Sequence, residues 1–160
     1  MKRNYHYGLI CLSLVFLTSC QSNQALSDSE LSATIQQQVL QTHRKTVQAT
    51  ETVGPKALFA YVLDNEGVII QNGQFYKNRQ DALSDTERGF EDVKTIEYTF
   101  DHEVVEVLSP DKALLKASGT ATVQTNNGRE FRTPLSQTVV FTQTPDGWKI
   151  LHAHHSTPTR

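Results

Sequence analysis

The sequence predicts an α+β fold in which helices come first and antiparallel strands follow. Apolar residues recur at helical spacing between residues 31 and 47, ahead of a Gly-Pro break. Beyond residue 93 the pattern changes, because apolar and polar residues alternate and turn signals separate the alternating stretches. Helices followed by strands that are joined through hairpins are typical of the α+β class.

The first predicted helix begins after Ser27 and ends at Gly54 and Pro55. Ser27 and Glu30 match the capping-box pattern of a helix start, and Gly followed by Pro is a helix stop. One face of this helix is formed by residues that recur four apart: Leu31, Ile35, Val39, His43 and Val47. A second, shorter helix is predicted from Pro55 to about Val62.

The segment from residue 64 to residue 90 combines turns, a short strand and a third helix. Turns are predicted at 64–67 and 72–73, where Asn, Asp and Gly cluster. The apolar run 68–70 between them is typical of a short strand. Residues 81–90 are predicted to form the third helix.

Four longer strands complete the predicted domain. The first alternates from Ile96 to Val104 and then changes phase at Val105, as a β-bulge requires, so we expect His102 to be buried beside Phe100. The second and third strands carry their apolar faces over residues 113–123 and 131–141. The last strand runs from Trp148 to about His155, and turns at 109–111, 126–128 and 144–147 separate the strands.

The N-terminus has the features of a secretory signal peptide. Lys2 and Arg3 precede an apolar run of about ten residues, which is too short to span a bilayer. The ending Leu17-Thr18-Ser19-Cys20 resembles the bacterial lipobox, which implies cleavage before Cys20 and lipidation of that residue. The alternatives are that Cys20 lies near a conventional cleavage site or in an uncleaved anchor.

The cysteine content agrees with lipidation. Cys11 would leave with the signal peptide, so the mature chain would hold Cys20 alone and no intramolecular disulfide. We therefore expect a signal peptide at 1–19, a polar tether at 20–29, one domain at 30–156 and a tail at 157–160. The predicted location is the bacterial cell envelope, and Gln21 after the cysteine favours the outer membrane if the host is Gram-negative.

Charge argues against nucleic acid as a partner. The mature chain would carry thirteen Lys and Arg against seventeen Asp and Glu, a net charge of about −4 with neutral histidines. No dense basic patch is visible in the sequence, and nucleic-acid binding normally needs one.

Three segments resemble the SnoaL-like branch of the nuclear transport factor 2-like superfamily. They are Gly73 to Arg79, which matches G-x-x-Y-x-x-R, Pro110 to Ala113 between long strands, and the closing strand from Asp146 to Ser156. The resemblance covers residues 30–156. It implies a cone, in which a bent antiparallel sheet curls around the helices, leaves a pocket and forms a homodimer through its outer face. Because the family includes enzymes as well as non-catalytic members, the fold does not decide the function.

The closing strand carries two histidine candidates. Strand alternation places His152 and His154 on the face of Trp148 and Ile150, with His155 on the opposite face. Two histidines at this spacing can share a metal ion, but no third ligand follows at a fixed spacing, so we predict no metal and no cofactor. We expect these histidines to bond within the sheet or to line a passive pocket.

An acid–base role is the open alternative. His152 or His154 would act as a general base with Asp64 or Asp101, although Asp64 lies in a turn and Asp101 on the polar face. Side chains with apolar bodies and polar tips suit a small apolar or amphipathic ligand. The full set of ligand-binding candidates is Tyr61, Asp64, Tyr76, Arg79, Tyr98, Trp148, His152 and His154.

Two function hypotheses follow, and neither rests on a complete catalytic set. The first is a lipid-anchored, non-catalytic module that binds a small molecule or serves protein association, including envelope assembly. The second is an isomerase, cyclase or lyase that uses a His or Asp general base in the cone pocket.

Overall fold

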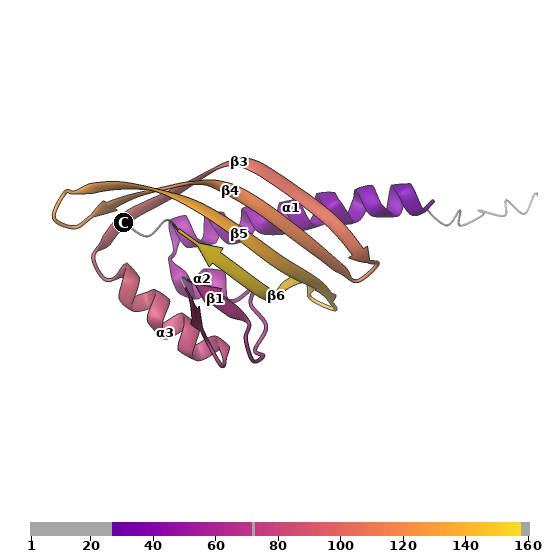
Figure 1. Ribbon diagram of the computed structural model, residues 1–160, viewed down its shortest axis with the longest axis horizontal. Coiled ribbons are helices and arrows are strands. Elements are labelled where there is room, and N and C mark those ends of the chain that lie inside the picture. Colours follow the sequence, from indigo (N-terminus) through magenta and orange to yellow (C-terminus); the bar gives the residue numbers. More distant parts are fainter. Residues whose placement is uncertain (1–26, 72, 158–160) are drawn as a thin grey trace, which may run out of the picture.

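A computed structural model describes residues 27–71 and 73–157. The predicted signal peptide and Cys20 lie outside these residues. Figure 1 shows the elements in chain order: α1 (Asp28–Thr52), α2 (Pro55–Phe59), β1 (Ile69–Gln71), β2 (Gln74–Phe75), α3 (Arg79–Phe90), β3 (Val93–Ser109), β4 (Lys112–Thr125), β5 (Glu130–Thr144) and β6 (Gly147–Ser156). Helices precede a long meander, so the predicted α+β class is confirmed.

Helix α1 begins where its cap predicts. The Ser27 side chain accepts a hydrogen bond from the backbone N–H of Glu30, and the Glu30 carboxylate accepts one from the backbone N–H of Ser27. Each bond satisfies a donor that the first turn leaves unpaired. The predicted apolar face is the buried one, with Ile35, Val39 and His43 against the sheet. Residues 28 and 29, which were predicted to belong to the tether, are already helical.

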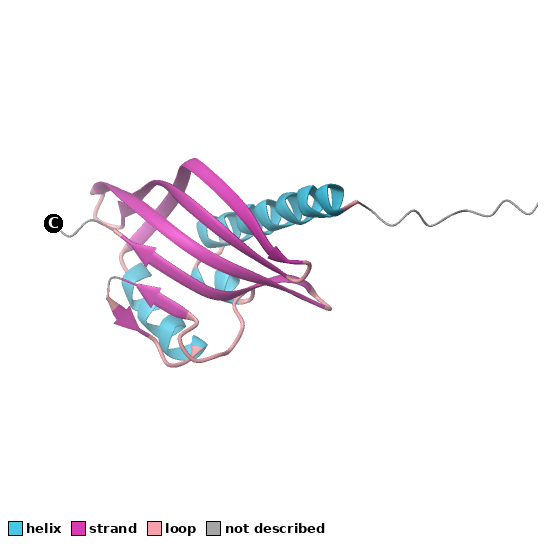
Figure 2. Ribbon diagram, turned by 45° about the vertical axis from the view of Figure 1, so that its right-hand side comes forward, coloured by secondary structure: helices cyan, strands magenta, loops and turns pink. Residues whose placement is uncertain are grey.

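The sheet is open and strongly curved, and the helices lie on its concave side (Figure 2). Its strand order is β2-β1-β6-β5-β4-β3, and β3 to β6 pair antiparallel as successive hairpins. The short strand β1 pairs in parallel with β6, and β2 forms a two-residue hairpin with β1. Sequence analysis did not identify β2 or the parallel pairing. A parallel pair joins segments far apart in the chain, so no local pattern marks it.

Two β-bulges decide which side chains point into the cone. One lies in β3 between Phe100 and His102, so Asp101 is the extra residue. The prediction for β3 placed the phase change after Val104 and was wrong by a few residues. His102 is exposed rather than buried, Val104 is 53% exposed, and Glu103 faces the helices instead.

Glycine makes the β3 bulge feasible. Gly119 of β4 lies opposite Phe100, and a Cβ atom at Gly119 would lie 2.0 Å from the backbone oxygen of Thr99. Such a contact is far inside the van der Waals distance, so no residue with a side chain fits there without moving the strand.

The core fills the space between α1 and the inner face of the sheet. Its fully buried large side chains are Phe141, Leu115, Val39 and Val68. Burying one such side chain contributes roughly 1.5–3 kcal/mol. The buried hydrophobic residues range from Ile35 to Ala153, so residues 21–160 include all of the described core.

Element boundaries differ slightly from those expected. Helix α2 ends at Phe59 rather than near Val62, and α3 begins at Arg79 because the Asn78 side chain caps it by accepting from the backbone N–H of Asp81. Over the described part of the chain, no helix has the length and apolar character needed to cross a membrane.

Candidate functional site

A cavity of about 220 Å³ lies between the C-terminal half of α1 and the concave face of the sheet. Most of its wall is apolar, formed by side chains from α2, β3, β5 and β6 such as Leu58, Phe100, Leu135, Val139, Phe141 and Ile150. An apolar cavity of about 150 Å³ is enough to hold benzene. This cavity therefore has room for a molecule of one or two rings.

Three side chains form a hydrogen-bonded chain beside the cavity. His43, which is 3% exposed, lies with its Nδ1 atom 2.9 Å from the Oε1 atom of Glu103. Its Nε2 atom lies 2.6 Å from the Nε2 atom of Gln137. Helix α1 supplies the histidine, while the bulged strand β3 supplies Glu103 and strand β5 supplies Gln137. Both ring nitrogens of His43 are therefore occupied.

The chemistry of the partners determines the tautomer of His43. A carboxylate can only accept, so His43 Nδ1 carries the proton and donates it to Glu103. Burial lowers the pKa of His43, and the hydrogen bond to Glu103 opposes that effect without cancelling it. The ring is therefore neutral, and its Nε2 atom accepts from the amide of Gln137.

His155 is the second histidine in the cavity wall. Burial lowers its pKa to about 4, and the neighbouring histidines act in the same direction. In the β5–β6 register His155 pairs with Gln137, so the two side chains lie next to each other on the concave face. None of the hydrogen bonds among the described residues involves its ring.

Aromatic side chains pack around this polar group. The ring of Phe100 meets His43 edge-on, with 4.9 Å between centroids, and stacks on Tyr98 at 6.4 Å. Tyr98 lines the cavity, and burial, with a smaller effect of Glu51, raises its pKa to about 12. Tyr98 is the one residue of the predicted ligand-binding set that lies in this cavity.

Two predicted candidates, Tyr61 and Trp148, lie in a separate groove that is lined by α1, by the residues after α2 and by the start of β6. The ammonium group of Lys149 lies 5.4 Å from the centroid of the Tyr61 ring. The indole N–H of Trp148 donates to Gln38 of α1 over 3.0 Å, which fixes the helix against β6. Both aromatic side chains therefore support the fold rather than the cavity.

Tyr76, Asp64 and Arg79 also have structural contacts. The hydroxyl of Tyr76 donates to Asp85 of α3 in a groove away from the cavity. Asp64 accepts from the backbone N–H of Arg79 over 3.2 Å, and the Arg79 guanidinium donates to the carbonyl of Val62. These contacts hold the start of α3 against the segment after α2.

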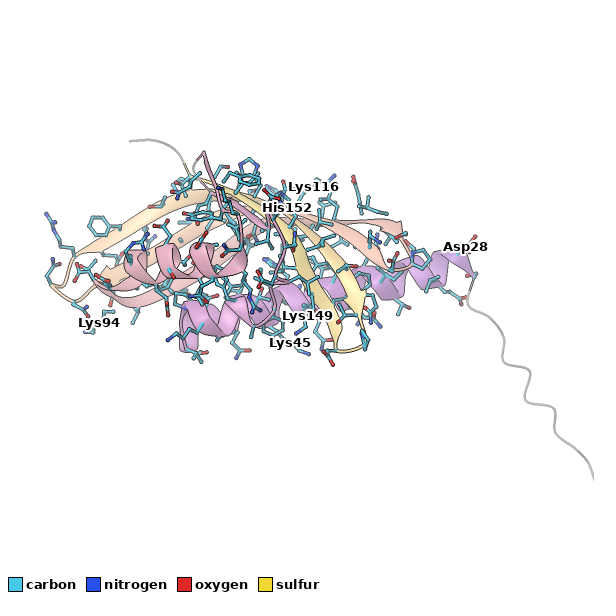
Figure 3. The ribbon with its side chains drawn as sticks, turned by 90° about the horizontal axis from the view of Figure 1, so that it is seen from below. Asp28, Lys45, Lys94, Lys116, Lys149 and His152 are labelled. Atoms are coloured by element: carbon cyan, nitrogen blue, oxygen red, sulfur yellow. The ribbon has the colours of Figure 1, made fainter. Side chains whose placement is uncertain are left out.

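The predicted facing of His152, His154 and His155 is wrong, because β6 contains the second bulge. Phe141 pairs with Ile150 and Val140 pairs with His152, which leaves Leu151 as the extra residue. The phase reverses there, so Ile150 and His155 share the concave face. Figure 3 shows His152 on the side of the sheet away from α1.

The two predicted histidines therefore do not line the cavity. The Nδ1 atom of His152 lies 2.8 Å from the carbonyl oxygen of Gly67, and His154 is exposed. A general base in the cavity cannot come from this pair. Asp101 is exposed as expected, so the predicted pairing of these groups does not occur.

Sequence reasoning missed Gln137, His155 and Glu103 as site residues. Gln137 was placed correctly on the apolar face of its strand, and a polar side chain within such a face was the available signal. Glu103 and His155 had no such signal, because each faces inward only after a bulge. Across the described residues, no group of three or more His, Cys, Asp or Glu side chains is arranged to hold a metal ion.

Comparison with known proteins identifies the fold. The profile of the SnoaL-like domain family matches residues 39–160. No match is found among curated proteins. The resemblance to this family that the sequence motifs indicated is thus confirmed.

Solved structures with the same fold come from several bacteria. A candidate dehydratase of the NTF2-like family from Streptomyces avermitilis is 18% identical, with a TM-score of 0.66 over 78% of this chain and 96% of that one. A candidate scytalone dehydratase from Novosphingobium aromaticivorans is 10% identical, with a TM-score of 0.68 over 77% and 83%. A ketosteroid isomerase-like protein from Erwinia carotovora is 15% identical, with a TM-score of 0.63 over 78% and 96%. At these identities the similarity shows the fold alone.

Proposed function

The chain belongs to the SnoaL-like domain family, and we propose that it binds a small apolar or amphipathic molecule in its cavity without transforming it. The observation that carries this proposal is the cavity of about 220 Å³, whose mostly apolar wall also carries the polar side chains of His43, Gln137 and His155. Concave, mostly apolar sites with a few convergent polar groups are the usual form of small-molecule sites.

The hydrogen bonding of His43 supports a binding role over a catalytic one. Both of its ring nitrogens are engaged, so neither is free to remove a proton from a ligand. The ring nitrogens of His155 have no hydrogen-bond partner among the described residues. Its pKa of about 4, however, makes it a weak base at neutral pH. General-base catalysis works best when the pKa of the base lies near the operating pH.

A cavity-filling variant tests the binding proposal. Ala121 of β4 lines the cavity, so Ala121→Leu reduces its volume, whereas Ala33→Leu makes the same change at an exposed site of α1. A metabolite panel that raises the melting temperature of the wild type and of Ala33→Leu, but not of Ala121→Leu, supports the cavity as the site. Equal shifts in all three proteins would place the binding elsewhere.

Catalysis is the second candidate, because a ligand that displaced Gln137 from His43 Nε2 would meet a base nitrogen on a histidine that Glu103 orients. An acidic residue that orients a histidine at a cavity is one form of base catalysis, and proteins named as a candidate dehydratase and as isomerase-like share the fold. Solvent deuterium exchange into an enolisable ketone such as 2-indanone is the test. Exchange that is faster with wild type than with His43→Gln would favour catalysis over passive binding.

We also propose that the protein is lipid-anchored in the bacterial cell envelope through Cys20. The support is the lipobox-like ending of the apolar N-terminal run. His43 follows Asp28 by fifteen residues, and a helix rises about 1.5 Å per residue, so α1 would hold the cavity roughly 20 Å from the tether. Labelled palmitate should enter the wild type, and incorporation that persists in Cys20→Ser would contradict the anchor.

The homodimer expected from the family resemblance remains part of this proposal. The face of the sheet that would form it carries small and polar residues such as Ser118, Thr120 and Thr138. Light scattering coupled to size exclusion on residues 21–160 measures the mass. A monomer at high concentration would count against the dimer.

A further inference from the structure

We propose that the cavity selects an uncharged ligand that donates a hydrogen bond, through a hydroxyl or N–H group on an apolar ring. The chain from Glu103 through His43 to Gln137 would set this preference. The inference rests on the proposed binding function and adds the chemical class of the ligand.

The wall of the cavity excludes charge. Among the described residues that line it, none is Asp, Glu, Lys or Arg, and the two histidines have lowered pKa values. A charged ligand would lose its hydration on entering and would find no ion of opposite sign. Anions are further disfavoured by the Glu103 carboxylate behind His43.

The hydrogen-bonded chain gives the cavity an acceptor. Glu103 can only accept, so His43 donates from Nδ1 and accepts at Nε2, and Gln137 must then direct its Nε2–H group at the ring. The amide oxygen of Gln137 is left without a hydrogen-bond partner among the described residues.

This oxygen is open to the cavity. Asn65 Oδ1 is the one fully buried side-chain oxygen or nitrogen without a partner in the described part of the chain, so Gln137 Oε1 retains accessible surface. Gln137 lies in the middle of the concave face and is 8% exposed in total. Since it lines the cavity, that surface belongs to the cavity.

His155 completes the polar end of the site. It is the cross-strand partner of Gln137, and its neutral ring has one donor and one acceptor nitrogen. A ligand hydroxyl placed between these two side chains can donate to the amide oxygen of Gln137 and accept from the N–H of His155, and a ligand N–H can donate to the same oxygen. A ligand with acceptors alone would leave the oxygen of Gln137 unpaired, and an unmade buried hydrogen bond weakens binding.

Indole and benzofuran are the matched probes. They have nearly the same shape, but indole carries an N–H donor and benzofuran does not. Calorimetric titration of residues 21–160 should show indole binding about tenfold more tightly, the factor that one hydrogen bond typically supplies. Benzoate, the charged probe, should bind more weakly than either.

The outcomes separate the two proposals. Binding of neither neutral probe would contradict the proposed function, and equal affinities for the two would overturn the ligand class while the binding function stands. Tighter binding of benzoate would also overturn the ligand class. The ¹⁵N chemical shifts of His43 give an independent test. Protonation at Nε2 instead of Nδ1 would refute the proposed direction of hydrogen-bond donation from Gln137 through His43 to Glu103.

A substitution of Glu103 tests the origin of the preference. In Glu103→Gln the new amide can donate to His43 Nδ1. The proton of His43 can then move to Nε2, and the Gln137 amide can turn to accept from it, so that its NH2 group faces the cavity. The ratio of the affinities for indole and benzofuran should therefore fall toward one. Glu106→Gln, on the exposed face of the same strand, should keep the wild-type ratio. Gln137→Leu removes the acceptor itself, so this protein should also bind indole and benzofuran with similar affinities. A folded Gln137→Leu protein that keeps the wild-type affinity ratio would refute the inference.

Discussion

Acid should destabilise this protein through His155. The folded state holds the pKa of His155 near 4, whereas the unfolded chain has the ordinary value of 6.5. Between these values the unfolded chain binds a proton that the folded chain does not, so stability falls as the pH drops from 6.5 to 4. Below about pH 4 both states are protonated and the loss from this residue stops growing.

The magnitude follows from the two pKa values. Between pH 7 and about pH 4.5 the linkage relation gives a loss of roughly 2 kcal/mol in the free energy of unfolding. Burial also lowers the pKa of His43, which adds a loss of the same sign. A domain of this kind has about 5–15 kcal/mol of stability in total, so the effect is measurable.

Urea unfolding at the two pH values is the assay. His155→Gln removes the titrating ring from the cavity, and His154→Gln makes the same change one residue away on the exposed face. The acid-induced loss should be smaller by roughly 2 kcal/mol in His155→Gln than in wild type. In His154→Gln it should stay close to the wild-type loss, because burial has a larger effect on the pKa of His155 than this neighbour has. Carboxyl groups with lowered pKa values are present in all three proteins, so their effect cancels in the comparison.

The reasoning would be refuted by equal acid-induced losses in wild type and His155→Gln. That result would mean that the ring is as well solvated in the folded state as in the unfolded chain. The second bulge would then not place His155 in an apolar cavity.

Three further predictions concern stability and titration. Gly119→Ala should lower the free energy of unfolding by about 3 kcal/mol, because the new methyl group meets the backbone of β3. The control Gly89→Ala in α3, with open space around it, should raise that free energy by about 0.5 kcal/mol in urea unfolding. A mild effect at Gly119 would contradict the bulge geometry. Glu103→Ala should cost about 1–3 kcal/mol in the same assay, because it leaves the buried Nδ1–H of His43 unpaired. Ultraviolet titration should show both Tyr98 and Tyr76 ionising near pH 12, and Tyr98→Phe should make that step smaller by one tyrosine. Ionisation of Tyr98 near pH 10 would argue against its burial.

Local patterns predicted much of this fold correctly. The cap at Ser27, the buried stripe of α1 and the inner faces of β4 and β5 follow from hydrogen bonds and periodicities within a few residues. The candidate site was predicted less well. Tyr98 alone among the proposed ligand-binding residues lines the cavity, and the histidine that β6 contributes to it is His155 rather than His152 or His154.

The amino-acid sequence by itself determined the class of the fold, the order of its helices and longer strands, and its family. The tertiary structure decided which side chains point into the cavity. One extra residue in a strand reverses the facing of every residue after it, and where that residue sits depends on pairing with the neighbouring strand. Such pairing joins distant parts of the chain, so Glu103 and His155 reach the cavity through contacts that no local pattern encodes.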